Sequence, residues 1–412
     1  MNLESLAQLA ENKLSNQNGS QFELRKNFLS RFKANGLKET TQDSYKFTNL
    51  ETFFSSLALN SDETSVQRDS NSDFPTIELI NGELNQTGKL PVGVSVKKIS
   101  EHFDVIQSYL KESNALSGLH HSLFEHGIFI EIDRKAEITS PLRILNFITK
   151  SDITSPTHLI VANPFSKITI IEETKSQGIS HANIAETYIK AMDGAIVEHI
   201  ALQEENNDGL NHTSLFSEVS KDATVRSFIF HSSGKMNRSN LELNLNDPGA
   251  NGESYSLFLT NGKEHSDINT VINHKAADTT SNQIAKGILD AESKGVFTGL
   301  IHIFPKAQRV ASGQLNKNLL LSKKAQVHSQ PQLEIFADDV KCSHGSTTGQ
   351  LSPEEIFYFQ ARGIPEEKAR NLLAFGFGLE VVQKIVNSEA EAYVSAIIKE
   401  NLATKFSLGK AL

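Results

Sequence analysis

The chain has 412 residues, enough for two or three small domains or for one elongated one. Hydrophobic residues make up 38% of it and charged residues 22%, a composition that supports a buried core rather than a disordered chain. The net charge of -9 gives no electrostatic footprint for nucleic acid or anionic lipid. The single cysteine, Cys342, excludes an intrachain disulfide and favours a reducing compartment.

The sequence contains no targeting or membrane-spanning pattern. Residues 1–13 carry Glu4 and Glu11 and contain no long apolar core, unlike a secretory signal. No apolar run approaches the roughly 18 residues of a membrane span. We therefore expect a soluble, cytoplasmic protein with neither a membrane nor a nucleic acid as partner.

Residues 1–60 have a helical pattern. Leucine and phenylalanine recur there at helix-like spacing, at Leu3, Leu6, Leu9 and Leu14 and at Phe22, Leu24, Phe28 and Phe32. The polar stretch Ser61–Asp73 predicts a linker. Beyond it, the pattern predicts a strand over Thr76–Ile80, a turn at Asn81-Gly82 and a helix over Ser100–Leu110.

Residues 128–337 contain short β-rich runs with little helical period. Polar links separate these runs, which lie at Lys167–Ile171, Ile196–Leu202, Val225–Phe230, Leu241–Leu245, Ser256–Leu259 and Val296–Phe304. Many short strands at such spacing are typical of a sandwich, a barrel or a solenoid. The length argues against one small sandwich, and no clean internal repeat is visible. The pattern alone does not choose among these architectures.

From Leu351 onward the chain is helical again. Ser352-Pro353-Glu354-Glu355 predicts a capping box, in which Ser352 caps the helix and Glu355 reaches back to it. Gly363 predicts the end of that helix and Pro365 the start of the next. A last helix is predicted over Ser388–Leu402.

The common nucleotide-binding and hydrolase signatures are missing from the sequence. It contains neither G-x-x-x-x-G-K-[ST] nor G-x-S-x-G, so a P-loop and an α/β-hydrolase are unsupported. The run His120-His121-Ser122-Leu123-Phe124-Glu125-His126 has the residue types of a zinc site. Its spacing matches neither H-E-x-x-H nor H-x-x-E-H, which favours structural or surface histidines.

Cys342 and His344 are the two candidate metal ligands that stand together. In an extended segment, residues two apart point to the same face, and thiolate and imidazole suit iron, zinc or copper. Lys341 lies beside the thiol and is expected to lower its pKa. Two ligands do not close a tetrahedral site, so others must come from elsewhere. An inert buried cysteine beside a turn histidine is the alternative interpretation.

The same stretch carries a family resemblance. The run Pro331–Gly349, continued by Phe357-Tyr358-Phe359 and Arg362-Gly363-Ile364, resembles the C-terminal signature of the SufB/SufD family. It is more similar to SufD-type members, because Ser343-His344-Gly345 and then Gly349-Gln350-Leu351 follow the cysteine. Further matching segments are Tyr45–Leu50, Gly127–Ile130, Asn273–Gln283, Val296–Gly299 and Asn318–Ser322.

Two features depart from the family pattern. Gly376 and Gly378 stand where alanine-like helix formers are usual, and each costs about 1 kcal/mol inside a helix. The sequence leaves open whether the helix kinks or breaks there. The linker Ser61–Asp73 has no counterpart in the family pattern.

The resemblance implies a mainly β fold, with a right-handed parallel β-helix over residues 128–340. A mixed helical domain over 1–127, with a linker near 61–73, and a helical domain over 341–412 are expected to flank it. It also implies a non-catalytic scaffold of iron–sulfur cluster assembly that pairs with SufB and binds the ATPase SufC. Family members can form homodimers in isolation, and the sequence leaves the oligomeric state of this chain open.

The resemblance assigns roles to particular residues. His344 and Cys342 are implied to lie at the interface with SufB and to contact a transient cluster there, His344 being the stronger candidate. No cofactor is expected to bind stably to the isolated chain. The SufC surface is expected near Phe357, Tyr358, Phe359 and Arg362.

Two other classes of function compete with this interpretation. Parallel β-helices often host polysaccharide-active enzymes, which need carboxylate or basic clusters in an open groove and often use tryptophan, and the chain has no tryptophan. A free-standing metal carrier would need more than one cysteine and one histidine in the same place. Both alternatives are therefore disfavoured.

Overall fold

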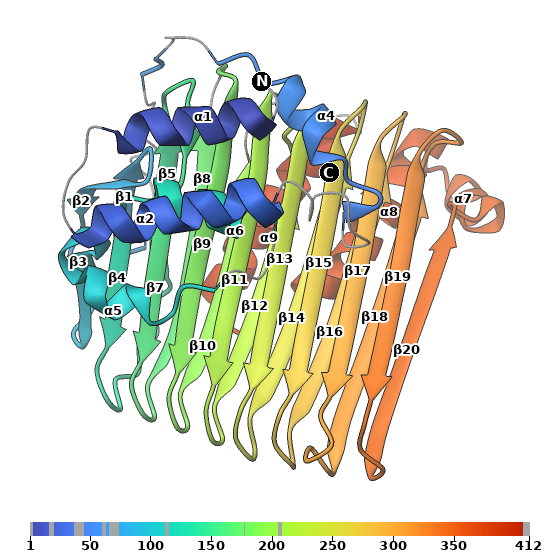
Figure 1. The fold of residues 1–412 in the computed structure, drawn as a ribbon. Helices are drawn as coiled ribbons and strands as arrows, with labels where there is room; N and C mark the ends of the chain where they lie inside the picture. Colours follow the sequence, from blue (N-terminus) through green and yellow to red (C-terminus); the bar gives the residue numbers. More distant parts are fainter. Residues whose placement is uncertain are drawn as a thin grey trace.

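The computed structural model describes residues 3–15, 20–36, 45–59, 63–65, 74–111, 115–176, 178–204 and 208–406. Two ten-stranded sheets form a parallel β-solenoid flanked by helices near both ends of the chain (Figure 1). Sheet 1 has the order β2-β1-β5-β8-β10-β12-β14-β16-β18-β20. Sheet 2 has the order β19-β17-β15-β13-β11-β9-β7-β4-β3, with β6 also paired to β9.

The strands lengthen along the chain, from five residues in β1 to ten or eleven in most strands after β8. Sheet 1 contains β1 (Thr76–Ile80), β2 (Glu83–Thr87), β5 (Leu142–Ile148), β8 (Lys167–Ser176), β10 (Ile196–Glu204), β12 (Thr224–His231), β14 (Asn251–Thr260), β16 (Thr280–Leu289), β18 (Val310–Leu320) and β20 (Val340–Gly349). Sheet 2 contains β3 (Val94–Lys98), β4 (Gly127–Ile132), β6 (Ile153–Thr154), β7 (Thr157–Ala162), β9 (His181–Ala191), β11 (Gly209–Val219), β13 (Met236–Leu245), β15 (His265–His274), β17 (Lys294–Ile303) and β19 (Gln326–Ile335).

From β8 to β20 the chain alternates between the two sheets, so each turn of the solenoid adds one strand to each sheet. All pairs in this stretch are parallel and keep register without a break. Among the strands of the described residues, only the pairs β1–β2 and β3–β4, at the start of the solenoid, are antiparallel. The predicted parallel β-helix is therefore confirmed, and the barrel and the sandwich are excluded.

The repeat that the sequence hides is visible in the register. Ile196 pairs with Lys167 and with Thr224, which are 29 and 28 positions away along the chain. Thr280 pairs with Asn251 and with Ala311, at offsets of 29 and 31. Because the length of a turn varies and the lumen accepts different side chains at equivalent places, no fixed sequence period results.

Inward-facing side chains from both sheets fill the lumen of the solenoid. Its apolar core consists mainly of aliphatic side chains, such as Ile170, Val197, Leu243 and Ile301. Aromatic side chains are fewer and include Phe258 and Phe297. This packing fixes the two sheets face to face, since slipping a strand by one residue would turn its apolar side chains outward.

Helices from the N-terminal part cover one end of sheet 2. They are α1 (Leu3–Leu14), α2 (Ser20–Arg31), the π-helix η1 (Phe32–Gly36), α4 (Leu50–Ser55) and α6 (Ser117–Leu123). Their buried side chains pack on residues at the start of the sheet 2 strands, including Ile184 and Leu210. The 3₁₀ helix η3 (Ile99–His102) and α5 (Phe103–Gln107) lie beside β4 and β7.

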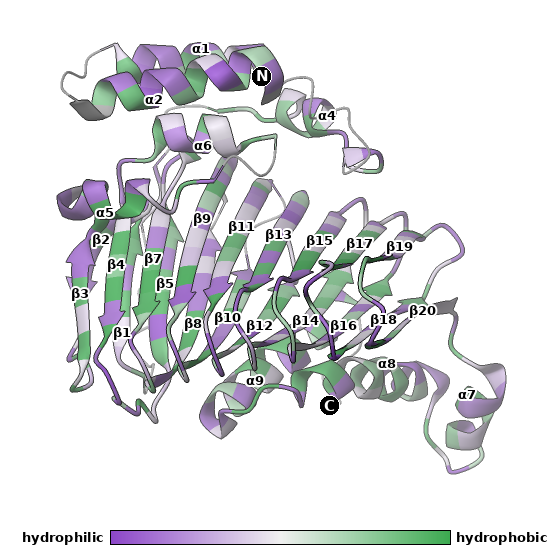
Figure 2. Ribbon diagram, turned by 60° about the horizontal axis from the view of Figure 1, so that its bottom comes forward, coloured by the Kyte–Doolittle hydropathy of each residue, from purple (hydrophilic) through white to green (hydrophobic). Residues whose placement is uncertain are grey.

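Two long C-terminal helices cover the outer face of sheet 1, on the opposite side from α1 and α2 (Figure 2). These are α8 (Glu366–Val382) and α9 (Ser388–Lys405), and a shorter helix, α7 (Pro353–Gln360), precedes them. Helix α8 runs without a break through Gly376 and Gly378, which answers the question that the sequence left open. A Cβ added to Gly378 would make only ordinary van der Waals contacts with Leu257 and Ile288. The packing of Ala374, Val381 and Val382 of α8 against sheet 1 offsets the low helix propensity of the two glycines.

The predicted helix ends are mostly confirmed. The Ser352 hydroxyl accepts hydrogen bonds from the backbone N–H groups of Glu354 and Glu355. However, the carboxylate that returns to Ser352 belongs to Glu354, not to Glu355 as expected, and it accepts from the Ser352 hydroxyl at 3.0 Å. Gly363 has a φ of 79°, as a left-handed helix end requires. Pro365 precedes α8 as its N-cap.

Two predictions in the N-terminal part have different outcomes. The turn at Asn81-Gly82 is confirmed, with φ of 52° and 85°, values that suit a two-residue hairpin. The single helix expected over residues 100–110 is instead η3 followed by α5, because His102 between them has a non-helical backbone. Of the expected linker over 61–73, residues 63–65 alone are described, and the rest lies outside the described residues.

The solenoid extends beyond the boundaries expected at 128 and 340. On its N-terminal side, β1 pairs in parallel with β5, which brings residues 76–80 into sheet 1. On its C-terminal side, β20 pairs along its length with β18, so residues 341–349 are part of the solenoid and not of a helical domain. Among the described residues, no helix is both long and apolar enough to cross a membrane.

Candidate functional site

Cys342 and His344 lie in β20, the last strand of sheet 1. Their register partners in β18 are Ser312 and Gln314, which are both buried in the lumen. Because side chains alternate along a strand, Cys342 and His344 share this lumen-facing side, as predicted. Cys342 packs partly against the apolar core and is half-buried, whereas His344 is exposed.

The last turn is open. Within the described residues β20 pairs only with β18, and β19 pairs only with β17. Each of these ten-residue strands therefore presents one edge of backbone N–H and C=O groups without a strand beside it, at the right-hand end of the solenoid in Figure 1. The two strands meet across the lumen, where the Ser329 and Ser346 hydroxyls lie 2.7 Å apart.

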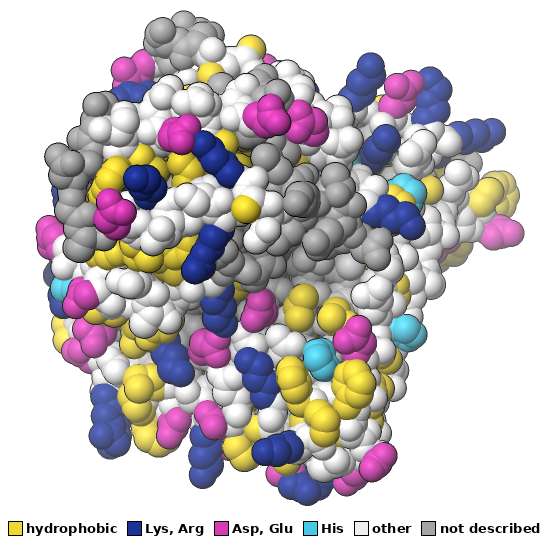
Figure 3. Space-filling view, in the orientation of Figure 1, with side chains coloured by type: hydrophobic (Ala, Val, Ile, Leu, Met, Phe, Trp, Pro, Cys, Tyr) yellow, Lys and Arg dark blue, Asp and Glu magenta, His cyan; other side chains and the backbone are white. Residues whose placement is uncertain are grey.

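Apolar side chains gather around this open end. Ile335, the last residue of β19, is 40% exposed, and Phe336, which follows it, is 59% exposed. The ring of His302 stacks on Phe304 with 4.2 Å between centroids and lies 5.5 Å from Phe336. In Figure 3, hydrophobic side chains gather over the lower ends of the right-hand strands. The exposed strand edges are therefore bordered by apolar surface. Covering this apolar surface would remove its unfavourable contact with water.

The Cys342 thiol is not activated by its neighbours. Burial raises its pKa, and a hydrogen bond with the backbone of Ser312 offsets only part of this increase. The expectation that Lys341 lowers the pKa is wrong, because adjacent residues of a strand point to opposite faces. The thiol is therefore a poor nucleophile in the isolated chain, although binding to a metal would still deprotonate it.

The described residues hold no group of three or more histidine, cysteine, aspartate or glutamate side chains that could bind a metal ion together. Cys342 and His344 thus supply two donors at the open end. A tetrahedral iron or zinc site needs at least two more. These must come from outside the described part of the chain.

The other predicted site residues lie on helix α7 and, in the case of Arg362, just after its end. Phe357 and Tyr358 are 69% and 55% exposed, and Phe359 is less so. The Arg362 guanidinium lies 3.4 Å from the centre of the Tyr358 ring and donates to the Tyr358 carbonyl. In Figures 1 and 2, α7 stands away from both sheets beyond the last turn. These residues and the pair Cys342–His344 belong to neighbouring parts of the same end of the molecule.

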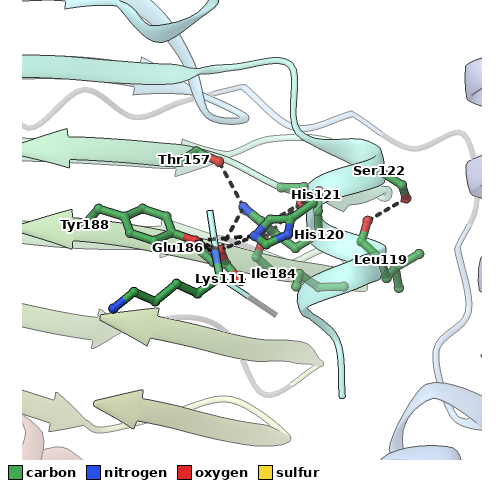
Figure 4. A network of polar contacts seen from close by, with 10 residues as sticks. Lys111, Leu119, His120, His121, Ser122, Thr157, Ile184, Glu186 and Tyr188 are labelled. Carbon is green, nitrogen blue, oxygen red and sulfur yellow. Dashed lines mark hydrogen bonds and ion pairs between the residues drawn. The ribbon is translucent and has the colours of Figure 1, made fainter. Parts of the chain in front are cut away.

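The histidine run at 120–126 has a structural role, as the sequence favoured. Nδ1 of His120 lies 2.7 Å from the Ile184 carbonyl, and its Nε2 lies 2.9 Å from the Thr157 hydroxyl. His121 bonds a carboxylate oxygen of Glu186 at 2.8 Å (Figure 4). These contacts fasten α6 onto sheet 2. The family-like turn near residue 274 is similar, because His274 is buried and bonds the Thr279 and Ser281 hydroxyls.

Sequence reasoning missed the polar interior beneath the open turn. Gln283, Gln314, Asn316 and Asn318 point into the lumen on the two preceding turns and bond one another or nearby backbone. One signal was present in the sequence, since polar residues occupy every second position from Ser312 to Asn318. In an amphipathic strand this spacing also fits a solvent-facing side, so the pattern alone does not reveal a polar lumen.

The comparisons with known proteins bear on the whole solenoid. The model of the family described as "SUF system FeS cluster assembly, SufBD core domain" matches residues 146–377, more than half of the chain. The chain belongs to the SufBD family. Its role accordingly lies in iron–sulfur cluster assembly, and the polysaccharide-active alternative is set aside.

The chain is similar to several family members. It is 32% identical to the iron–sulfur cluster assembly protein SufD of Escherichia coli over 240 residues, 58% of this chain and 56% of that protein. Identity to a SufBD family protein of Synechocystis is 28% over 326 residues, covering 74% and 71%. The SufD of Bacillus subtilis is 25% identical over 361 residues, covering 83% and 80%.

The buried histidines predict acid sensitivity. Burial lowers the pKa of His120, His265 and His274 to about 4 and that of His212 and His231 to about 3. The unfolded chain gains these protons near pH 6.5, whereas the folded protein does not. The free energy of unfolding should therefore fall as the pH drops from 6.5 towards 4, by up to about 1.4 kcal/mol per pH unit for each such group.

Denaturant unfolding of the wild type between pH 7.5 and 4.5 measures this slope. His231→Asn should flatten it, whereas His126→Asn should not, because His126 is exposed. An equal stability of the wild type at pH 7 and pH 5 would contradict the assignment.

The raised pKa of Cys342 predicts a slow thiol. Iodoacetamide at pH 8 should alkylate the folded chain more slowly than the same chain in denaturant, because burial keeps less of the thiol ionised. The single cysteine makes the mass-spectrometric readout unambiguous. Lys341→Ala should leave the rate unchanged, and a clearly slower rate in this variant would restore an activating role for the lysine.

Proposed function

We propose that the chain is a SufD-type, non-catalytic scaffold subunit that pairs with a SufB-type partner through its open last turn. The observation that carries this proposal is the coincidence of two free strand edges with two metal-binding side chains. The edges of β19 and β20 border the lumen into which Cys342 and His344 point. A partner that covers the edges thereby also reaches the side chains.

Pairing along the free edges is supported by general sheet physics. A long unpaired strand edge presents a row of donors and acceptors that another strand satisfies readily. A single-chain protein usually shields such an edge with charge, proline or a helix. Here β19 contains Pro331. In β20, Lys341 is followed by neutral residues up to Gly349, apart from His344. The β20 edge is thus the less protected one, and a second copy of the chain could use it when the partner is absent.

The nascent cluster is cargo at this interface and not a resident cofactor. Cys342 and His344 offer one sulfur and one nitrogen donor, so the partner must supply the other ligands. The isolated chain should then hold no cluster stably. His344 is the more accessible of the two, and its imidazole binds metal without first losing a proton when it is neutral.

The SufC ATPase is proposed to dock on the C-terminal helices around α7. Exposed aromatic residues next to arginine are typical of binding hot spots, and Phe357, Tyr358 and Arg362 form such a group. ATP hydrolysis would belong to that partner, in keeping with the missing P-loop of this chain. The complex would act in the cytoplasm.

The first prediction concerns His344. His344→Ala should leave folding and partner pairing intact, because an exposed side chain contributes at most about 0.5 kcal/mol to stability. Cluster formation by the complete complex should fall about tenfold or more, as is usual when metal-site residues are lost. Cys342→Ser should have a smaller effect.

The measurement is the rate of cluster formation, followed by visible absorption, in co-purified complexes with the SufB-type and SufC partners. Ser343→Ala is the matched control, since Ser343 lies on the opposite face of the same strand. If complexes with His344→Ala build clusters at the wild-type rate, the proposed role of this end is wrong.

The second prediction concerns α7. Tyr358→Ala should weaken SufC binding by about 2 kcal/mol, a typical hot-spot loss, while pairing with the SufB-type partner stays unchanged. Calorimetry with purified SufC measures this, and Val92→Ala serves as a control because Val92 is 97% exposed in a loop before β3. Deleting all C-terminal helices is less informative, because α8 and α9 bury the outer face of sheet 1. Unchanged SufC affinity in Tyr358→Ala would place the docking surface elsewhere.

A further inference from the structure

A column of aligned side chains, hydrogen-bonded as far as Gln314, leads up the lumen to His344. The register aligns Gln283 in β16 with Gln314 in β18, and Gln314 with His344 in β20. Nε2 of Gln314 donates to Oε1 of Gln283 at 2.7 Å. Nε2 of Gln283 donates in turn to the hydroxyl of Thr270 on the facing sheet, and this hydroxyl donates to the Thr298 carbonyl.

The contacts along this column have one consistent direction of donation. The Thr270 hydroxyl donates to the Thr298 carbonyl at 3.4 Å and accepts from Nε2 of Gln283 at 2.5 Å. The amide of Gln283 therefore turns its oxygen towards Gln314, which must present its NH₂ group to that oxygen. Flipping the Gln314 amide would set two carbonyl oxygens against each other.

Gln314 is left with a carbonyl oxygen that nothing satisfies. The side chain is 3% exposed, and its Oε1 has no hydrogen-bond partner among the described residues. A buried acceptor that stays unpaired is destabilising, because it has lost its hydrogen bonds to water without gaining another. In a ladder of stacked amides each oxygen faces the next strand along the ladder, so the Gln314 oxygen faces the last turn.

The position of the Gln314 amide is held by close packing. A Cβ atom added to Gly299 would lie 2.4 Å from its Nε2, so only glycine leaves room for the amide there. The side chain is therefore confined between Gly299 and Gln283. His344, the next residue of the column, is exposed, so its ring has room to rotate towards Oε1 of Gln314.

We infer that Gln314 is a positioning residue for His344. Its Oε1 accepts the N–H of the neutral imidazole, which fixes one tautomer and leaves the lone pair of the other ring nitrogen directed outward, towards the cluster. Metal-binding histidines commonly have such an acceptor behind them. The inference deepens the proposed function and rests on it, because the outward nitrogen has a use only if His344 binds the cluster.

A neighbouring column supplies a matched control. Asn318 is as buried as Gln314, and its Oδ1 also lacks a partner among the described residues. Its amide nitrogen donates to Asn316 at 2.6 Å. This column, however, ends at Thr348 and not at His344. A change at Asn318 thus disturbs the same turn of the lumen without removing the acceptor that faces the imidazole.

The test is nitrogen-15 NMR of the His344 ring in the isolated full-length chain at pH 7.5. The wild type should show one dominant neutral tautomer, with a ring N–H that exchanges with water slowly enough to be seen directly. Gln314→Met should abolish that signal and give the tautomer mixture of a solvated histidine, whereas Asn318→Met should preserve it.

If the His344 ring of the wild type shows the tautomer mixture of a solvated histidine, the inference is overturned. This measurement needs no variant, so the inference remains testable even if Gln314→Met fails to fold. Loss of the signal in both methionine variants also overturns it, because the cause would then be a general loosening of the last turns. In the complete complex, Gln314→Met should lower the rate of cluster formation about tenfold.

The proposed function and the inference about Gln314 are contradicted by different results. If His344→Ala builds clusters normally while the wild-type ring shows the fixed tautomer, the proposed function fails but the positioning contact stands. If His344→Ala blocks cluster formation while the tautomer is unrestrained, the function stands and the inference about Gln314 fails.

Discussion

The in-register parallel pairing of successive turns is the constraint on which the rest of this structure depends. Each strand from β8 to β18 satisfies the backbone groups of the turn before it and is satisfied by the turn after it. This pairing ends at β19 and β20, where no further turn follows. A finite stack of turns necessarily ends in a strand edge whose backbone groups are not paired. In this chain, Cys342 and the lumen-facing His344 lie at that edge.

The helices determine which surfaces remain available. Helices α1, α2 and α6 bury the start of sheet 2, and α8 and α9 bury the outer face of sheet 1. Buried histidines and carboxylates fasten these layers, as His121 does with Glu186. The open end, by contrast, lies between the exposed group on α7 and the exposed residues Ile335 and Phe336. Under the proposed function, these two exposed features at one end would be contacted by two different partners at once.

Much of the fold could be predicted from local patterns, and the site only in part. The hairpin turn was predicted from Asn81-Gly82 and the helix cap from Ser352, because both signals depend on a few neighbouring residues. The sheet order could not be predicted, because turns of unequal length conceal the repeat. That Cys342 and His344 share a face followed from their spacing. The lumen-facing direction, the raised pKa of the thiol and the column beneath His344 depend on pairing with β18, which lies some 30 positions earlier in the chain.

Amide hydrogen exchange over residues 326–335 and 340–349 tests the central claim most directly. It should be measured for the isolated chain and for its complex with a SufB-type partner. The account predicts that amides on the free edges of β19 and β20 exchange rapidly in the isolated chain and become protected in the complex, while β8 and β10 stay unchanged. A stable complex that leaves exchange in β20 unaltered would contradict the claim that the open last turn is the pairing surface.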